Sequence, residues 1–136
     1  MTDDKKMEIL TEIVNGNLGK AREMASVELR NEIKNAIARE FQFFKQNAIN
    51  HWTKEEIFDK AFEIHGKTEI AGIFESCELN DEDYETLAKV SLEIKEGTLL
   101  YELYEYYLNH EYTSVENYDE IEQWIKLFCK REREMN

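Results

Sequence analysis

Apolar residues recur at helical spacing along this 136-residue chain. The longest series, with steps of three or four residues, consists of Ile33, Ile37, Phe41, Phe44, Ala48 and Trp52. Steps of this size place side chains on one face of a helix. Strict alternation of apolar and polar residues over the length of a strand is absent, and the chain has no proline to interrupt its helices. The sequence therefore predicts an all-α fold without a sheet.

Glycines and capping residues predict where the helices begin and end. A first helix begins near Asp3 and ends at Asn15-Gly16, and a long helix is expected over 20–50. Because the expected connections are short, residues 1–136 are predicted to form a compact single-domain bundle of six to seven helices. Residues 1–19 are expected to be an N-terminal helical extension of this domain.

The second half of the chain carries further helix boundaries. Thr53 and Glu56 have the spacing of a capping box, and Gly66 is predicted to end the helix that follows. Gly97 is predicted to end a later helix. The remaining helix starts are expected at Thr68, Asn80, Thr98 and Ser114.

Acidic residues outnumber basic residues by 30 to 17, which gives a net charge of −13. This charge opposes nonspecific binding to nucleic acids and to anionic membranes, because phosphate groups are repelled. With 42% hydrophobic and 12% aromatic residues, the chain is too apolar for a disordered acidic tail. No apolar run is long enough for a secretion signal or a membrane span, so a cytoplasmic location is expected.

Residues that could carry chemistry are scattered along the sequence. Cys77 and Cys129 are far apart, and no two Cys or His residues lie within ten positions of each other. The chain lacks the Glu-x-x-His motif of di-iron bundles, and the acidic run at Asn80 lacks the glycine and glutamate of an EF-hand. We therefore expect no metal, no cofactor and no enzymatic activity.

The negative charge is concentrated in the middle of the chain. Residues 55–122 contain twenty acidic and four basic side chains, whereas the flanks contain ten and thirteen. The densest run consists of Glu75, Glu78, Asp81, Glu82, Asp83 and Glu85. This pattern is typical of a solvated acidic face with helix capping, and it also fits a binding surface for a basic partner.

Tyrosine is the second compositional bias. Six tyrosines lie between positions 101 and 118, interleaved with glutamates. Tyr104 and Tyr107 share a helix face with leucines and fit a core position. Tyr101, Tyr106 and Tyr112 are expected to be exposed, where they would anchor an arginine-rich partner through stacking and charge-assisted hydrogen bonds.

A set of short motifs runs from residue 28 to residue 125. They are Glu28-Leu29, Glu40, Phe41, Phe44, TKEEIFDKAFEI (53–64), Lys67, Glu69-Ile70, Glu78-Leu79-Asn80, Leu87, LLYELYEYYLNHEY (99–112) and Asp119-Glu120-Ile121. In these motifs the chain resembles a family of small, acidic, uncharacterised helical domains from phages and conjugative elements of Gram-positive gut bacteria. The family often has prolines where Thr53 and Thr98 stand. The resemblance implies a mobile-element setting, in which small acidic proteins block host restriction or CRISPR nucleases.

Two functions are therefore expected as alternatives. The first is a non-enzymatic acidic module that binds a basic protein, with an anti-defence inhibitor of a nucleic-acid-binding enzyme as its concrete form. The second is a helical scaffold that forms homodimers or larger assemblies through the tyrosine-rich helix. Salt dependence distinguishes the two functions, because charge-driven association weakens as salt screens it.

Overall fold

The computed structural model describes residues 1–76, 79–108 and 118–135, with only the backbone of 118–121. This described part is built from α-helices and contains no strand, so the all-α prediction is confirmed. The predicted helix start at Ser114 lies outside the described residues. The helices are α1 (Asp3–Val14), α2 (Leu18–His51), α3 (Lys54–Asp59), α4 (Ala61–Ser76), α5 (Asp81–Glu93), α6 (Leu99–Leu108) and α7 (Tyr118–Met135).

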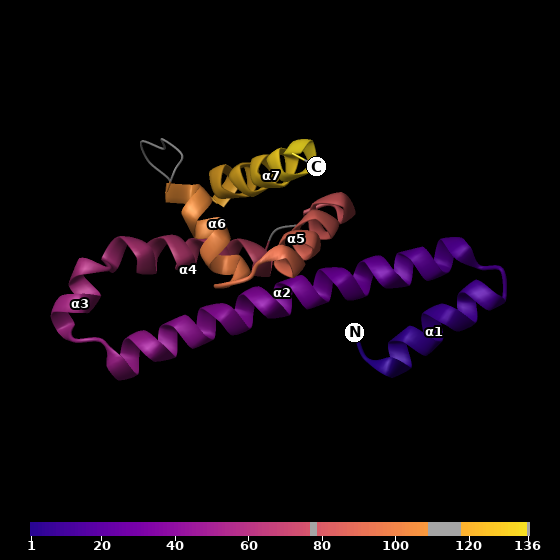
Figure 1. Ribbon diagram of the computed structural model, residues 1–136, viewed down its shortest axis with the longest axis horizontal. Coiled ribbons are helices and arrows are strands. Elements are labelled where there is room, and N and C mark those ends of the chain that lie inside the picture. The colour runs from indigo at the N-terminus through magenta and orange to yellow at the C-terminus, as the bar shows by residue number, and fades with distance from the viewer. Residues whose placement is uncertain (77–78, 109–117, 136) are drawn as a thin grey trace.

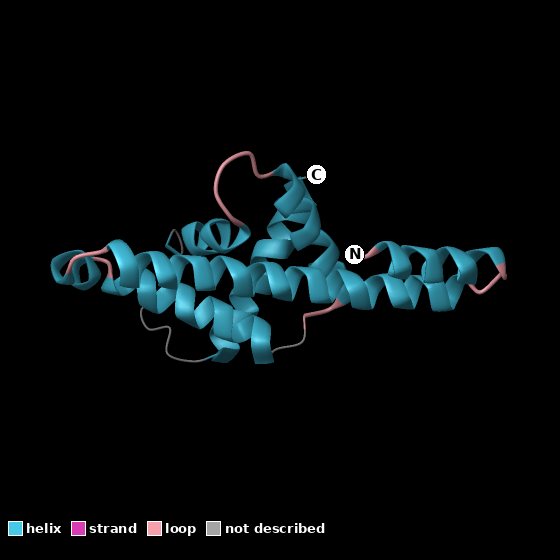
Figure 2. Cartoon of the chain, turned by 90° about the horizontal axis from the view of Figure 1, so that it is seen from below, coloured by secondary structure: helices cyan, strands magenta, loops and turns pink. Residues whose placement is uncertain are grey.

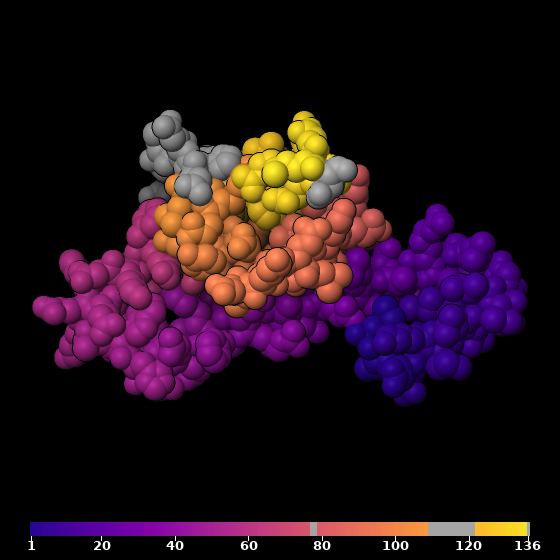
Figure 3. Space-filling view, in the orientation of Figure 1, coloured from indigo at the N-terminus to yellow at the C-terminus, as the bar shows by residue number. Residues whose placement is uncertain are grey.

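Helix α2 runs the length of the molecule, and most other helices pack against it (Figure 1). Helix α1 folds back along the first part of α2 and forms an antiparallel hairpin with it. Helices α4, α5 and α6 lie against the rest of α2, and α7 packs on these three. Seen from below, the described elements are helices without a strand (Figure 2). We call α4–α7, with the part of α2 that they cover, the body. The hairpin extends beyond this body at one end (Figure 3).

The hydrophobic core lies where α2, α4, α5, α6 and α7 meet. The predicted apolar stripe of α2 supplies Ile33 and Ile37 to this core, and Phe41 packs against it. The stripe ends outside the core, where Phe44 and Trp52 meet edge to face with ring centroids 5.5 Å apart. The largest fully buried side chains of the core are Trp124, Tyr84, Phe74, Phe128, Ile37, Ile70, Ile73, Leu87, Leu99, Leu100 and Leu103.

The start of α6 is fixed by a carboxylate from α2. Glu40 Oε2 accepts a hydrogen bond from the backbone amide of Leu100 at 2.9 Å, and Oε1 accepts one from the amide of Leu99 at 3.4 Å. The hydroxyl of Thr98 accepts a third bond, from the amide of Tyr101 at 3.0 Å. These acceptors satisfy amides that have no partner within the helix, and the negative charge of Glu40 lies at the positive end of the helix dipole.

The helix boundary predicted at Gly66 is wrong, because α4 continues through Gly66 and the break lies earlier, at Lys60. Gly66 instead allows α4 to approach α6 closely. A Cβ atom at this position would lie 2.9 Å from Cε2 of Tyr104 and 3.4 Å from Cε1 of Tyr107. Helix α5 also ends before its predicted stop, at Glu93, and Gly97 follows in the connection with a φ of 97°.

We expect the substitution Gly66→Ala to lower the free energy of unfolding by about 1 to 3 kcal/mol, because the added methyl group overpacks the contact with Tyr104. Gly19→Ala is the matched control, since Gly19 is also helical but has no atom within 4 Å of its added Cβ. The control is expected to stabilise the chain by about 0.5 to 1 kcal/mol. Urea denaturation measures both, and equal effects of the two substitutions would contradict the packing role of Gly66.

Candidate functional site

The later members of the predicted acidic run lie in the first turns of α5, and ion pairs within the chain partly neutralise their charge. The side chain of Asn80 caps the helix by accepting a hydrogen bond from the amide of Asp83 at 2.8 Å. Asp81 pairs with Arg30 of α2 at 3.0 Å, and Glu82 with Arg133 of α7 at 3.5 Å. These carboxylates therefore hold α5 against its neighbours.

Asp83 is buried, which corrects its predicted role in partner binding. Its side chain is 2% exposed, and Oδ1 accepts a hydrogen bond from Arg133 at 2.9 Å. This bond raises the pKa of Arg133. The same guanidinium donates to the hydroxyl of Thr86 at 3.4 Å. Asp83 therefore joins α5 to α7 and is not accessible to a partner.

The remaining members of the run differ in accessibility. Glu75 at the end of α4 and Glu85 in α5 are exposed, and neither has an ion pair within the described part of the chain. Glu78 lies outside the described residues. Of the six predicted carboxylates, Glu75 and Glu85 are therefore the unpaired, exposed ones that the structure describes.

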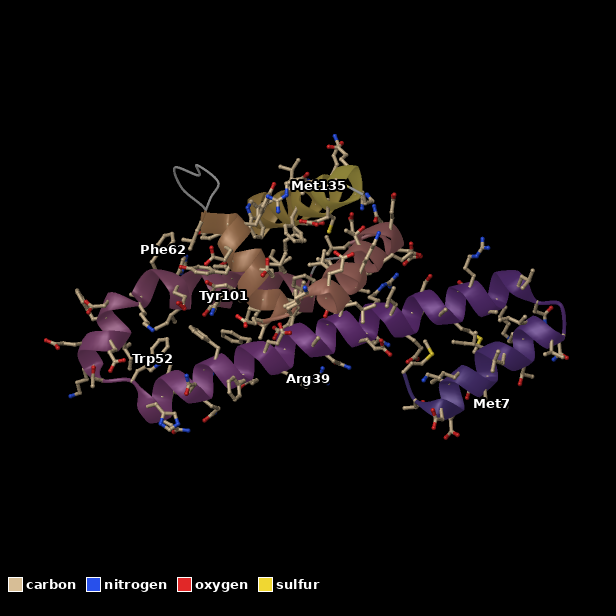
Figure 4. The ribbon with its side chains drawn as sticks, in the orientation of Figure 1. Met7, Arg39, Trp52, Phe62, Tyr101 and Met135 are labelled. Atoms are coloured by element: carbon tan, nitrogen blue, oxygen red, sulfur yellow. The ribbon has the colours of Figure 1, made fainter. Side chains whose placement is uncertain are left out.

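The three candidate tyrosines also differ in their exposure to solvent. Tyr106 is buried, with its ring centroid 5.1 Å from that of Trp124 and 5.2 Å from that of Phe128, so its predicted exposure is wrong. Tyr112 lies outside the described residues. Tyr101 is 43% exposed, as expected, and lies on α6 where this helix meets α4 (Figure 4).

Carboxylates from two helices surround Tyr101, and we call this group of Tyr101, Glu63, Glu102 and Glu105 the Tyr101 patch. A hydrogen bond from the Tyr101 hydroxyl to Glu105, together with the charges of Glu105, Glu63 and Glu102, raises the pKa of the tyrosine. Burial first, then the charges of Glu63 and Glu105, raises the pKa of the neighbouring Tyr104 to about 12. Glu102 and Glu105 are two of the glutamates that interleave with the tyrosines in the sequence, whereas Glu63 lies far from them along the chain. The four-residue step from Tyr101 to Glu105 indicates from the sequence that the two side chains are neighbours on one helix. Glu63 belongs to α4, so its position next to Tyr101 depends on how the helices pack.

Lys67 lies beneath the Tyr101 patch, among aromatic rings. Its Nζ is 4.0 Å from the ring centroid of Phe44, 5.6 Å from that of Tyr101 and 5.7 Å from that of Tyr104. It also pairs with Glu63 at 3.5 Å, and the residue is buried. The faces of aromatic rings attract cations. Lys67 therefore already places one cation against these rings and against the carboxylate of Glu63.

The thiol of Cys129 is part of the core. It donates a hydrogen bond to the backbone carbonyl of Asp83 over 3.7 Å. Burial, followed by the charge of Asp83, raises the pKa of Cys129 to about 12. The residue is therefore a neutral thiol at physiological pH and lacks the thiolate that a nucleophile requires.

The described residues contain no group of three or more His, Cys, Asp and Glu side chains placed to hold a metal ion. Among the helices described, none has the length and apolar character required to cross a membrane.

Comparison with known proteins gives no relative from which a role could be transferred. No model of a protein family matches the chain, and searches of curated proteins and of solved structures also find no match.

We expect Asp83→Ala to lower the free energy of unfolding by about 2 to 3 kcal/mol, because Arg133 loses its buried partner. Asp81→Ala is the matched control, since Asp81 also begins α5 and also pairs with an arginine, but its side chain is 54% exposed. The control is expected to lower the free energy of unfolding by at most about 1 kcal/mol. Denaturant unfolding compares the two variants, and a larger loss for Asp81→Ala would exclude the structural role of Asp83.

We also expect the chain to lose stability as the pH rises above the ordinary thiol value of 9.0. Because the pKa of Cys129 is raised in the folded state, its contribution is fully present below the pKa of the unfolded chain and is lost as the pH rises through the folded value. Unfolding measured between about pH 8 and 10 tests this, before most tyrosines titrate. Cys129→Ala is expected to show a shallower pH dependence, and an unchanged slope would refute the assignment.

Proposed function

We propose that the chain is a non-enzymatic binding protein whose Tyr101 patch receives basic side chains of a partner protein. The observation that carries this proposal is the exposed ring of Tyr101 among the carboxylates of Glu63, Glu102 and Glu105. An arginine can stack on the ring while it donates hydrogen bonds to a carboxylate, and such pairs are common anchors of protein interfaces.

The charge distribution supports a basic partner. Residues 1–51 contain eight acidic and eight basic side chains, so the net charge of −13 lies entirely in residues 52–136. The Tyr101 patch is therefore part of the acidic portion of the chain. Such a field attracts a basic protein from a distance and accelerates association, and salt screens the effect.

A nucleic-acid-binding enzyme is the concrete partner class, because its binding channel presents arginines and lysines to phosphates. By occupying this channel, an acidic protein would exclude the nucleic acid. The resemblance to domains of phages and conjugative elements favours a host defence nuclease as the target.

Two charge reversals of equal size test the proposal. The double variant Glu102→Lys/Glu105→Lys alters the Tyr101 patch, and Glu75→Lys/Glu85→Lys makes the same change of net charge elsewhere. Immobilised chains are used to capture basic proteins from a bacterial lysate, and the affinity of each captured protein is then measured. We expect the patch variant to bind the specific partner with an affinity at least about tenfold lower than the wild type, and the control to lose much less affinity.

Salt and nucleic acid supply the second part of this test. Raising the salt from about 50 to 300 mM should weaken the complex, and DNA or RNA should compete with the chain for the partner. Equal losses of affinity in both double variants would mean that the total charge of the chain, and not the Tyr101 patch, drives capture of the partner. Retention of no basic protein by the wild-type chain would reject the proposed function.

A further inference from the structure

The hairpin of α1 and α2 leaves an apolar face uncovered. Helix α1 contains no buried residue. Met7, Leu10 and Val14 follow one another at steps of three and four residues and are 61%, 52% and 83% exposed, so they form one stripe on the helix (Figure 4 labels Met7). Leu18, at the start of α2, is 62% exposed and follows this stripe directly in sequence.

Within one chain, α1 packs along α2 but has no fully buried residue. Isolated helices of about twelve residues are marginal in water, so α1 depends on what it packs against. On the side facing α2, Ile9 is half-buried, and a groove of about 290 Å³ separates the two helices there. Polar contacts supply the other attachments, namely the ion pair of Lys20 with Glu12 at 3.3 Å and that of the N-terminal amine with Glu32. Covering the exposed stripe of α1 would bury further apolar surface and stabilise the hairpin.

Charge indicates that a second copy of the chain covers the stripe. The hairpin, residues 1–32, holds seven acidic and five basic side chains, a net charge of −2, whereas residues 33–136 hold 23 acidic and 12 basic side chains, a net charge of −11. Two copies therefore repel each other strongly where their acidic bodies meet and only weakly at the hairpin. The hairpin is therefore the part of the surface at which self-association meets the least electrostatic opposition.

The two ends of the hairpin also carry complementary charges. Asp3 and Asp4 lead the first turn of α1, and the exposed Arg22 lies at the opposite end of the hairpin, near the start of α2. A twofold axis near Leu10 would align two α1 helices antiparallel. It would bring Asp3 and Asp4 of each copy beside Arg22 of the other, and it would oppose the two helix dipoles favourably.

From these observations we infer that the chain forms a twofold-symmetric dimer in which the stripe of Met7, Leu10, Val14 and Leu18 packs against the same stripe of a second copy. The two hairpins together make a four-helix arrangement. This contact uses none of the residues of the Tyr101 patch. Its failure and the failure of the proposed function are therefore separate results.

Sedimentation of the full-length chain over a range of concentrations tests this inference. Leu10→Glu is expected to raise the dissociation constant of the dimer by about 100-fold, because each dimer loses two buried leucines. Phe58→Glu is the matched control, since Phe58 is an equally apolar side chain, 81% exposed, outside the hairpin. The control should leave the dimer unchanged, and circular dichroism checks that both variants remain helical.

A charge exchange provides an independent readout. Asp3→Lys should weaken the dimer, and adding Arg22→Glu in the same chain should restore it, because the two positions meet across the twofold axis. A chain that is monomeric at all concentrations overturns the inference. So does a dimer that survives Leu10→Glu, a dimer that Phe58→Glu dissolves equally, or an absence of rescue in the double charge variant.

Discussion

The face of α2 that packs on the other helices determines the rest of the structure. Ile33 and Ile37 fill the centre of the core, while two charged residues on the same helix orient its neighbours. Glu40 receives the first amides of α6, and Arg30 pairs with the beginning of α5. Apolar burial supplies most of the driving force, and these polar contacts specify where each helix starts.

Features that depend on a few neighbouring residues could be predicted from the sequence. The capping box of Thr53 and Glu56 forms as expected, with hydrogen bonds of 3.1 and 3.3 Å, and Asn80 caps α5. Gly66 was misassigned because glycine serves both to end helices and to allow close helix contacts, and only the position of Tyr104 decides between them. The pairing of Asp83 with Arg133, which lies fifty positions away, has no local signal at all.

The same limit applies to the candidate site. A dense acidic run suggested a binding surface, yet the most deeply buried of its described members, Asp83, serves packing between helices. The carboxylates that surround Tyr101 come from α4 and α6, which are separated in sequence, so that composition could indicate an acidic region but not its centre. Counting charges therefore overestimates how much of an acidic segment is available to a partner.

The length of α2 would set the distance between the two Tyr101 patches of the inferred dimer. A helix of 34 residues spans about 51 Å. Since the hairpin occupies one end of this helix and the body lies toward the other, a dimer joined through its hairpins would carry its two bodies at opposite ends. Such a dimer is bivalent, with room for two partner molecules that do not touch. A target that displays repeated basic surfaces would then be held by avidity, beyond the strength of either single contact.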